Sequence, residues 1–117
     1  MYVGRDFASF QNQAAKILGF DMTPLLADDE VITAVTSRLR IDPALDPLPA
    51  THLPVQPQFS GNLINQLVSF NDPTDSLLGY SYALNFAVTT DADRILMPWS
   101  RFLIIPGFGV SSYFKNR

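Results

Sequence analysis

The chain has 117 residues, of which 47% are hydrophobic and 16% are charged, and its formal net charge is −3. This length suits a single domain that buries a core without a disulfide or a metal ion, and the low charged share leaves much surface that tolerates contact with another protein. The eight lysine and arginine residues are scattered, which argues against nucleic-acid binding, and the lack of cysteine excludes disulfides, thiolate chemistry and cysteine-ligated zinc.

The start of the chain predicts an arm followed by a strand. Residues 1–12 show no hydrophobic period and no long apolar run, so we expect an N-terminal arm and no secretory leader. Residues 15–22, "AKILGFDM", alternate in polarity and place Leu18 and Phe20 on one face. A strand that ends before Pro24 is favoured, with a short helix as the alternative.

The clearest single strand is "VITAVTSRLRI", residues 31–41. Its β-branched residues are typical of strands. The alternation places Val35 and Leu39 on one face, toward the core, and Arg38 and Arg40 on the other.

The middle of the chain is rich in proline. Residues 42–58, "DPALDPLPATHLPVQPQ", contain five prolines, which exclude a helix and a central strand. We expect a long extended connection with an edge strand near Val55. Residues 62–70, "NLINQLVSF", alternate and favour a strand, although a helical stripe also fits them.

Residues 80–105 predict a β-hairpin. Apolar side chains recur at every second position from Tyr80 to Val88, and the positions between them are small, so another layer or a neighbouring molecule can approach that second face. "TDAD", residues 90–93, is the turn. Residues 94–105 return antiparallel, and Pro98 within them indicates an edge or a bulge. No run approaches the length of a membrane span.

Together these segments predict six or seven short strands, which is typical of a β-sandwich. We expect an all-β fold with a sandwich over residues 13–107, an arm over residues 1–12 and a C-terminal tail over residues 108–117. The predicted core residues are Leu18, Phe20, Val35, Leu39, Tyr82, Leu84, Phe86, Val88 and Trp99.

One stretch, "LLGYSYALNF" at residues 77–86, resembles the corner of a fibronectin-type or immunoglobulin-like sandwich. In that corner a leucine and a glycine precede a tyrosine that opens an alternating strand, and here Leu78, Gly79 and Tyr82 fit. The resemblance implies that the tyrosine ring fills the end of the core and that its hydroxyl bonds to the backbone. Tyr80 is the alternative corner residue.

A wider resemblance joins three segments in order: "MYVGRDF" at the start, "FDMTPLLADDEVITAV" at residues 20–35 and "YALNFAVTTDADRILMPWSRFLI" at residues 82–104. Together they are similar to a family of short immunoglobulin-like virion proteins of tailed bacteriophages and prophages, many of them described as fiber–tail adaptors. The chain differs from the family pattern at Asp29, where glycine is usual, and at Pro98, which interrupts the last strand.

This resemblance implies a non-enzymatic virion structural protein, made in the bacterial host cytoplasm, that acts as an adaptor at the neck or tail and joins a fiber or neighbouring tail components. The implied partners are connector, tail or fiber subunits and further copies of the chain in a ring, with no cofactor, nucleic acid or membrane. A capsid decoration (cement) protein of the same fold is one alternative. A carbohydrate-binding module that uses Trp99 and tyrosines is another.

Few residues suggest a reaction. His52 is the only histidine, and we expect a solvated residue in the proline-rich connection rather than a catalytic or metal-binding group. The acidic segments 28–30 and 91–93 can in principle bind calcium, but solvated turns are the favoured interpretation. We therefore expect neither an enzyme nor a metal site.

Aromatic residues near both ends of the chain predict a contact surface, because they lie outside any clear core period and have few charges around them. Packing on their own domain is the alternative. The predicted interface residues are Tyr2, Phe7, Phe10, Phe108, Tyr113 and Phe114.

Overall fold

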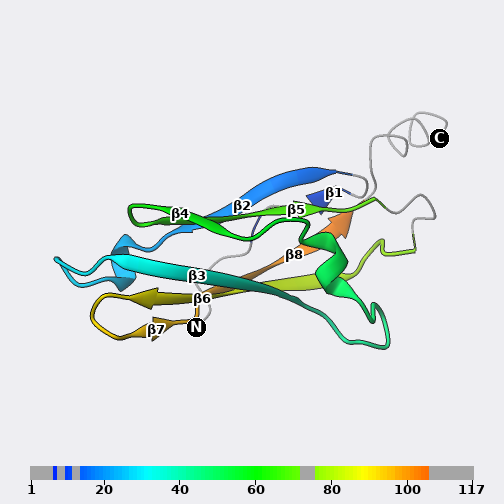
Figure 1. Ribbon diagram of the computed structural model, residues 1–117. Helices are drawn as coiled ribbons and strands as arrows, with labels where there is room; N and C mark the ends of the chain where they lie inside the picture. The colour runs from blue at the N-terminus through cyan, green and yellow to red at the C-terminus, as the bar shows by residue number, and fades with distance from the viewer. Residues whose placement is uncertain (1–6, 8–9, 12–13, 72–75, 106–117) are drawn as a thin grey trace.

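The structure of the protein, a computed structural model, describes residues 7, 10–11, 14–71 and 76–105. These residues form an all-β sandwich of two sheets (Figure 1). The larger sheet has the order β1 (Phe10–Gln11), β8 (Trp99–Ile105), β6 (Ser81–Thr90), β3 (Ile32–Arg40), and β7 (Ile95–Leu96) also pairs with β6. The smaller sheet has the order β2 (Ala15–Asp21), β5 (Leu63–Ser69), β4 (Gln58–Ser60). Two short 3₁₀ helices, Thr23–Leu25 and Pro49–His52, lie in connections.

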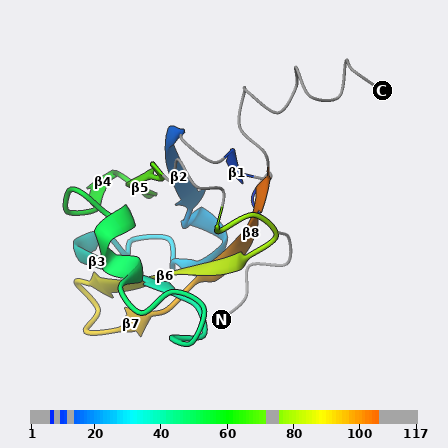
Figure 2. The ribbon, with the colours of Figure 1, turned by 90° about the vertical axis from the view of Figure 1, so that its right-hand side faces the viewer.

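The core lies between the two sheets. Figure 2 shows β2, β4 and β5 in one layer and β3, β6 and β7 in the other, with β8 and β1 on one side. Both layers contribute to one hydrophobic cluster, in which aromatic rings pack edge to face and stacked across the interior. The largest fully buried side chains of this core are those of Tyr82, Phe10, Phe70, Phe86, Phe102 and Met22.

Strand β6 is the centre of the larger sheet, and its alternation is complete. Tyr82, Leu84, Phe86 and Val88 are buried, whereas the positions between them are half-buried on the opposite face. Of the other predicted core residues, Leu18 and Leu39 are buried, and Phe20 and Val35 are half-buried and pack against the cluster.

Strand β3 differs from the predicted face pattern at its start. The pairing with β6 shifts between Ile32 and Ala34, an irregularity of the β-bulge type. Ile32 is consequently buried, whereas Val31, which simple alternation places on the core face, is exposed. From Val35 onward the predicted alternation holds.

Trp99 corrects the sequence interpretation, because it is half-buried and lies outside the core cluster. In the β6–β8 pairing Trp99 faces Asn85, and residues that face each other across antiparallel strands point to the same side of the sheet. Trp99 therefore shares the outward face of β6. Pro98 does not shift the register: Phe86 N donates to Pro98 O at 3.0 Å, so the proline only divides the returning strand into β7 and β8.

The proline-rich connection is more structured than expected. It contains the 3₁₀ helix Pro49–His52, in which proline occupies a first-turn position that requires no N–H donor. Val55 itself lies in no strand, and the edge strand predicted near it, β4, begins three residues later at Gln58. Residues 62–70 contain β5, so the strand alternative applies there.

The predicted interface residues near the N-terminus pack on their own domain. Phe10 is fully buried in β1, which pairs in parallel with β8, and its ring packs against Phe70 and Phe102. Phe7 stacks on Phe20 with ring centroids 5.1 Å apart. Burial of these large aromatic rings outweighs the entropy cost of ordering the two side chains. Tyr2, Phe108, Tyr113 and Phe114 lie outside the described residues.

Candidate functional site

An open groove of about 750 Å³ lies on the outward face of the larger sheet, opposite the core. Its floor is the small-residue face of β6, which the sequence predicts to be approachable. Its walls come from β3 on one side and from the β7–β8 strand on the other. The residues that define this outer-face groove are Arg38, Arg40, Ala83, Asn85, Met97 and Trp99.

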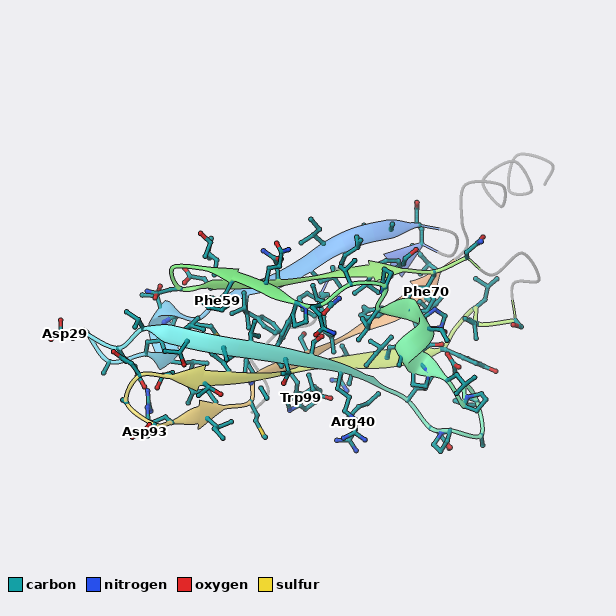
Figure 3. All side chains as sticks on the ribbon, in the orientation of Figure 1. Asp29, Arg40, Phe59, Phe70, Asp93 and Trp99 are labelled. Carbon is teal, nitrogen blue, oxygen red and sulfur yellow. The ribbon has the colours of Figure 1, made fainter. Side chains whose placement is uncertain are left out.

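The strand register explains how these residues come together. Asn85 is paired with Arg38 on β3 and with Trp99 on β8, so the three side chains form one row across the sheet. Since neighbouring strands lie about 4.8 Å apart, the walls on β3 and β8 are separated by about 10 Å. Figure 3 shows Arg40 and Trp99 on the side of the sheet that faces away from the smaller layer. The groove is therefore wide enough for one loop or one extended segment.

The groove is cationic. Arg38 and Arg40 are exposed, and neither is ion-paired within the described part of the chain. A third arginine, Arg101, is exposed on the same face, because it is paired with Ala83 in the next row. Guanidinium groups bind carboxylates and other planar anions in a bidentate manner.

One polar atom on the groove floor lacks a partner. The side-chain oxygen of Asn85 is buried and accepts no hydrogen bond from any described residue. A buried acceptor without a donor costs free energy. Arginine, tryptophan and this amide together provide charge, an apolar surface and a directional hydrogen bond.

Four carboxylates gather at one end of the sandwich, in the loops that precede β3 and follow β6. We name this group the acidic tip; it consists of Asp28, Asp29, Asp91 and Asp93, all exposed. Two hydrogen bonds join the loops. The backbone N–H of Val31 donates to the Asp91 carboxylate, and the backbone N–H of Asp91 donates to the Val31 carbonyl, both at 3.0 Å. Figure 3 shows Asp29 and Asp93 at this end.

Glu30 braces the acidic tip from within and is not the solvated turn residue that the sequence suggests. Its side chain is 1% exposed and is held by the guanidinium of Arg94, with Arg94 Nε 2.8 Å from Glu30 Oε2. The Thr90 hydroxyl and the Ala27 amide also donate to it. These hydrogen bonds, that of Arg94 first, lower the pKa of Glu30 to about 2, and Glu30 in turn raises the pKa of Arg94.

His52 is also not a solvated loop residue. Its ring stacks on Phe70 with centroids 4.0 Å apart, and its Nε2 lies 3.0 Å from Asp46 Oδ2. The same oxygen accepts a hydrogen bond from the Tyr82 hydroxyl at 2.7 Å. Burial raises the pKa of Asp46, but the hydrogen bonds from Tyr82 and His52 outweigh it and hold the pKa below its ordinary value. This cluster lies at the base of the proline-rich connection and anchors it to β6.

Within the described ranges, no group of three or more histidine, aspartate or glutamate side chains is placed to hold a metal ion. The groove was partly visible in the sequence, as the small face of residues 80–89 and the outward Arg38 and Arg40. The sequence interpretation did not place Trp99 in the wall of the groove. The signal was present, because Trp99 and Arg101 are two residues apart on one strand and so point to the same side of the sheet. The Asp46–His52–Tyr82 cluster depends on Tyr82, which is 36 residues from Asp46 in the chain, and so has no local signal.

No protein-family model matches the chain, and no curated protein matches its sequence. No helix in the part of the chain that the structure describes is long and apolar enough to cross a membrane.

Proposed function

We propose that the protein is a non-enzymatic structural component of a tailed-bacteriophage virion, an adaptor at the neck or tail that joins a fiber or neighbouring tail subunits. The proposed partners are other virion proteins and further copies of the chain. The observation that carries a binding role is the outer-face groove, in which Arg38 and Arg40 on β3 lie beside Asn85 and have no ion-pair partner among the described residues. The virion assignment is supported by the sequence resemblance.

Strand topology supports an immunoglobulin-like sandwich within this proposal. The order β2–β5–β4 in one sheet and β8–β6–β3 in the other corresponds to the strand orders B–E–D and G–F–C of immunoglobulin domains. Tyr82 lies at the start of β6, the position of the tyrosine in the immunoglobulin corner, and Gly79 before it has φ of +84°. The hydroxyl of Tyr82 donates to the Asp46 carboxylate, whereas the corner pattern calls for a backbone acceptor.

The rigid sandwich suits an adaptor for a physical reason. A binding surface on paired strands keeps its geometry before the partner arrives, so little conformational entropy is lost on docking. Weak contacts of this kind combine strongly when several copies are arranged around a symmetric ring.

The copy number of the chain in purified particles tests the proposal. We expect quantitative mass spectrometry against the major shell protein to give a small, ring-like number. A count in the hundreds per particle would replace the adaptor role by capsid decoration. Absence from particles would reject both virion roles.

Carbohydrate binding is the second candidate, and the outward position of Trp99 favours it. An indole ring beside arginine and asparagine side chains is suited to stack on a sugar and to bond its hydroxyl and acidic groups. Replacement of Trp99 by alanine tests this function. Loss of glycan binding with an intact fold supports it, and a protein that binds no bacterial surface glycan in either form contradicts it.

A further inference from the structure

The molecule carries two surfaces of opposite charge. The outer-face groove is lined by Arg38 and Arg40 and is open to solvent. The acidic tip presents four exposed carboxylates on two adjoining loops. Among the described residues, none of these charged groups is ion-paired.

The two surfaces of one copy do not neutralise each other. Strand β3 is continuous between them, and Arg38 lies seven residues beyond Val31 at the tip. At about 3.3 Å per residue this is a separation of about 23 Å along a rigid strand, against a Debye length of about 8 Å at physiological ionic strength. Both surfaces are therefore available to another molecule.

The acidic tip is organised for docking. Its two loops are fixed to each other by the Val31–Asp91 hydrogen bonds and from beneath by the Glu30–Arg94 ion pair. Val31 is 52% exposed beside the carboxylates, and Met97 is 58% exposed at the groove wall. An apolar contact bordered by charge pairs is the usual composition of a protein interface.

We propose that the acidic tip of one copy docks into the outer-face groove of the next copy. The contact joins two different surfaces, so it is heterologous and forms a ring where the rotation closes. Only the ring rests on the proposed function, because in an adaptor these two surfaces are the ones through which neighbouring copies meet. The contact itself follows from the charges and holds for the purified protein.

Sedimentation velocity of the purified full chain tests this contact over a range of concentrations. We expect self-association in about 0.01 M salt, where the Debye length is about 30 Å, and mostly monomer in about 1 M salt, where it is about 3 Å. The charge reversals R38E/R40E in the groove and D28K/D29K at the tip should each lower the association constant by about tenfold or more.

The decisive step mixes the two reversed variants. The groove variant has an acidic groove and an acidic tip, and the tip variant has a basic groove and a tip with two lysines beside Asp91 and Asp93, so neither variant alone keeps the native charge complementarity. In the mixture the acidic tip of the groove variant meets the basic groove of the tip variant, which restores the native contact. We expect the mixture to associate more strongly than either variant alone. Lys16→Glu, a reversal at an exposed position on β2 in the other sheet, is the matched control and should leave association unchanged.

Circular dichroism establishes that each variant is folded, and the neutral pairs R38Q/R40Q and D28N/D29N replace any reversal that is not. A chain that stays monomeric in low salt, or a mixture that does not associate, would overturn the proposal. So would a monomer that binds polygalacturonate through Arg38 and Arg40, because the occupant would then be an acidic glycan. Particle copy number is a separate measurement, so the virion role and this contact can fail independently.

Discussion

A single carboxylate, that of Glu30, joins the loop before β3 to the turn after β6. Its hydrogen bonds lower its pKa from 4.5 to about 2. Because the pKa is lower in the folded chain than in the unfolded chain, the ionised group stabilises the fold above about pH 4.5. That contribution is lost as the pH falls from 4.5 toward about 2.

We therefore expect the urea midpoint of unfolding to fall as the pH is lowered through this window. The substitution Glu30→Gln should reduce this pH dependence and should also lower the stability at neutral pH. Two other carboxyl groups also have lowered pKa values. Hydrogen bonds from Thr23 lower the pKa of Asp21, and at Asp46 burial raises the pKa but the hydrogen bonds from Tyr82 and His52 outweigh it. A smaller dependence of stability on pH therefore persists in the variant. Urea titrations between pH 7 and pH 2 measure both effects. An unchanged slope in the variant would show that Glu30 is not the group that titrates.

The buried Tyr82 hydroxyl gives a second prediction at the same scale. Tyr82→Phe removes its hydrogen bond to the Asp46 carboxylate and should lower the free energy of unfolding by about 1–3 kcal/mol, as expected for a bond to a charged group. Tyr80→Phe is the control, because Tyr80 is half-buried and no hydroxyl partner is seen for it among the described residues, so the change should be near zero. Equal effects in chemical denaturation would contradict the special role of Tyr82.

The two faces of strand β8 differ in how well they tolerate substitution. Phe102 is paired with Tyr82 on the core face and is 2% exposed, whereas Trp99 lies on the outward face. Phe102→Ala should cost about 3–5 kcal/mol, and Trp99→Ala clearly less, because only the first leaves a buried cavity. Denaturation followed by far-UV circular dichroism compares the two, and a larger loss for Trp99→Ala would return that residue to the core.

Strand β2 approaches its partner closely at Gly19. A Cβ atom at this position would meet the backbone carbonyl oxygen of Ile64 on β5, which cannot move away as a flexible side chain can. Gly19→Ala should therefore destabilise the smaller sheet by about 1–3 kcal/mol through overpacking. Ile17→Ala on the same strand is the control, since its side chain is 68% exposed, and comparable urea midpoints for the two variants would contradict the clash.

The elements also show where sequence reasoning succeeds. Period-two alternation was sufficient to place β6 and its inward side chains, because this strand is regular over its whole length, and it favoured a strand over a helix for β5. It failed for Val31 because the register shift in β3 depends on pairing with β6. Alternation also places Trp99 on the face of Arg101, two residues away on the same strand, but the hydrophobicity of Trp99 suggested a core position instead. Contacts such as Asp46 with Tyr82 join residues 36 apart in the chain and cannot be read from local pattern.

At the scale of the whole molecule, one hydrophobic cluster includes side chains from both sheets, such as Ile64 on β5 and Phe86 on β6. Two layers that share one core should unfold together, because neither layer has another surface on which to bury its inward face. The single tryptophan, Trp99, lies in the larger sheet and therefore reports on that layer alone.

Ile64→Ala, in the smaller sheet, should lower the free energy of unfolding by about 2–5 kcal/mol. We expect the Trp99 fluorescence transition and the far-UV circular dichroism transition to shift together, although the substitution lies in the opposite layer. Leu63→Ala is the matched control: Leu63 is 54% exposed on the outward face, and the change should stay within about 0.5 kcal/mol. A fluorescence midpoint that does not move in Ile64→Ala would mean that the two sheets unfold separately, and the outer-face groove would then not depend on the smaller sheet.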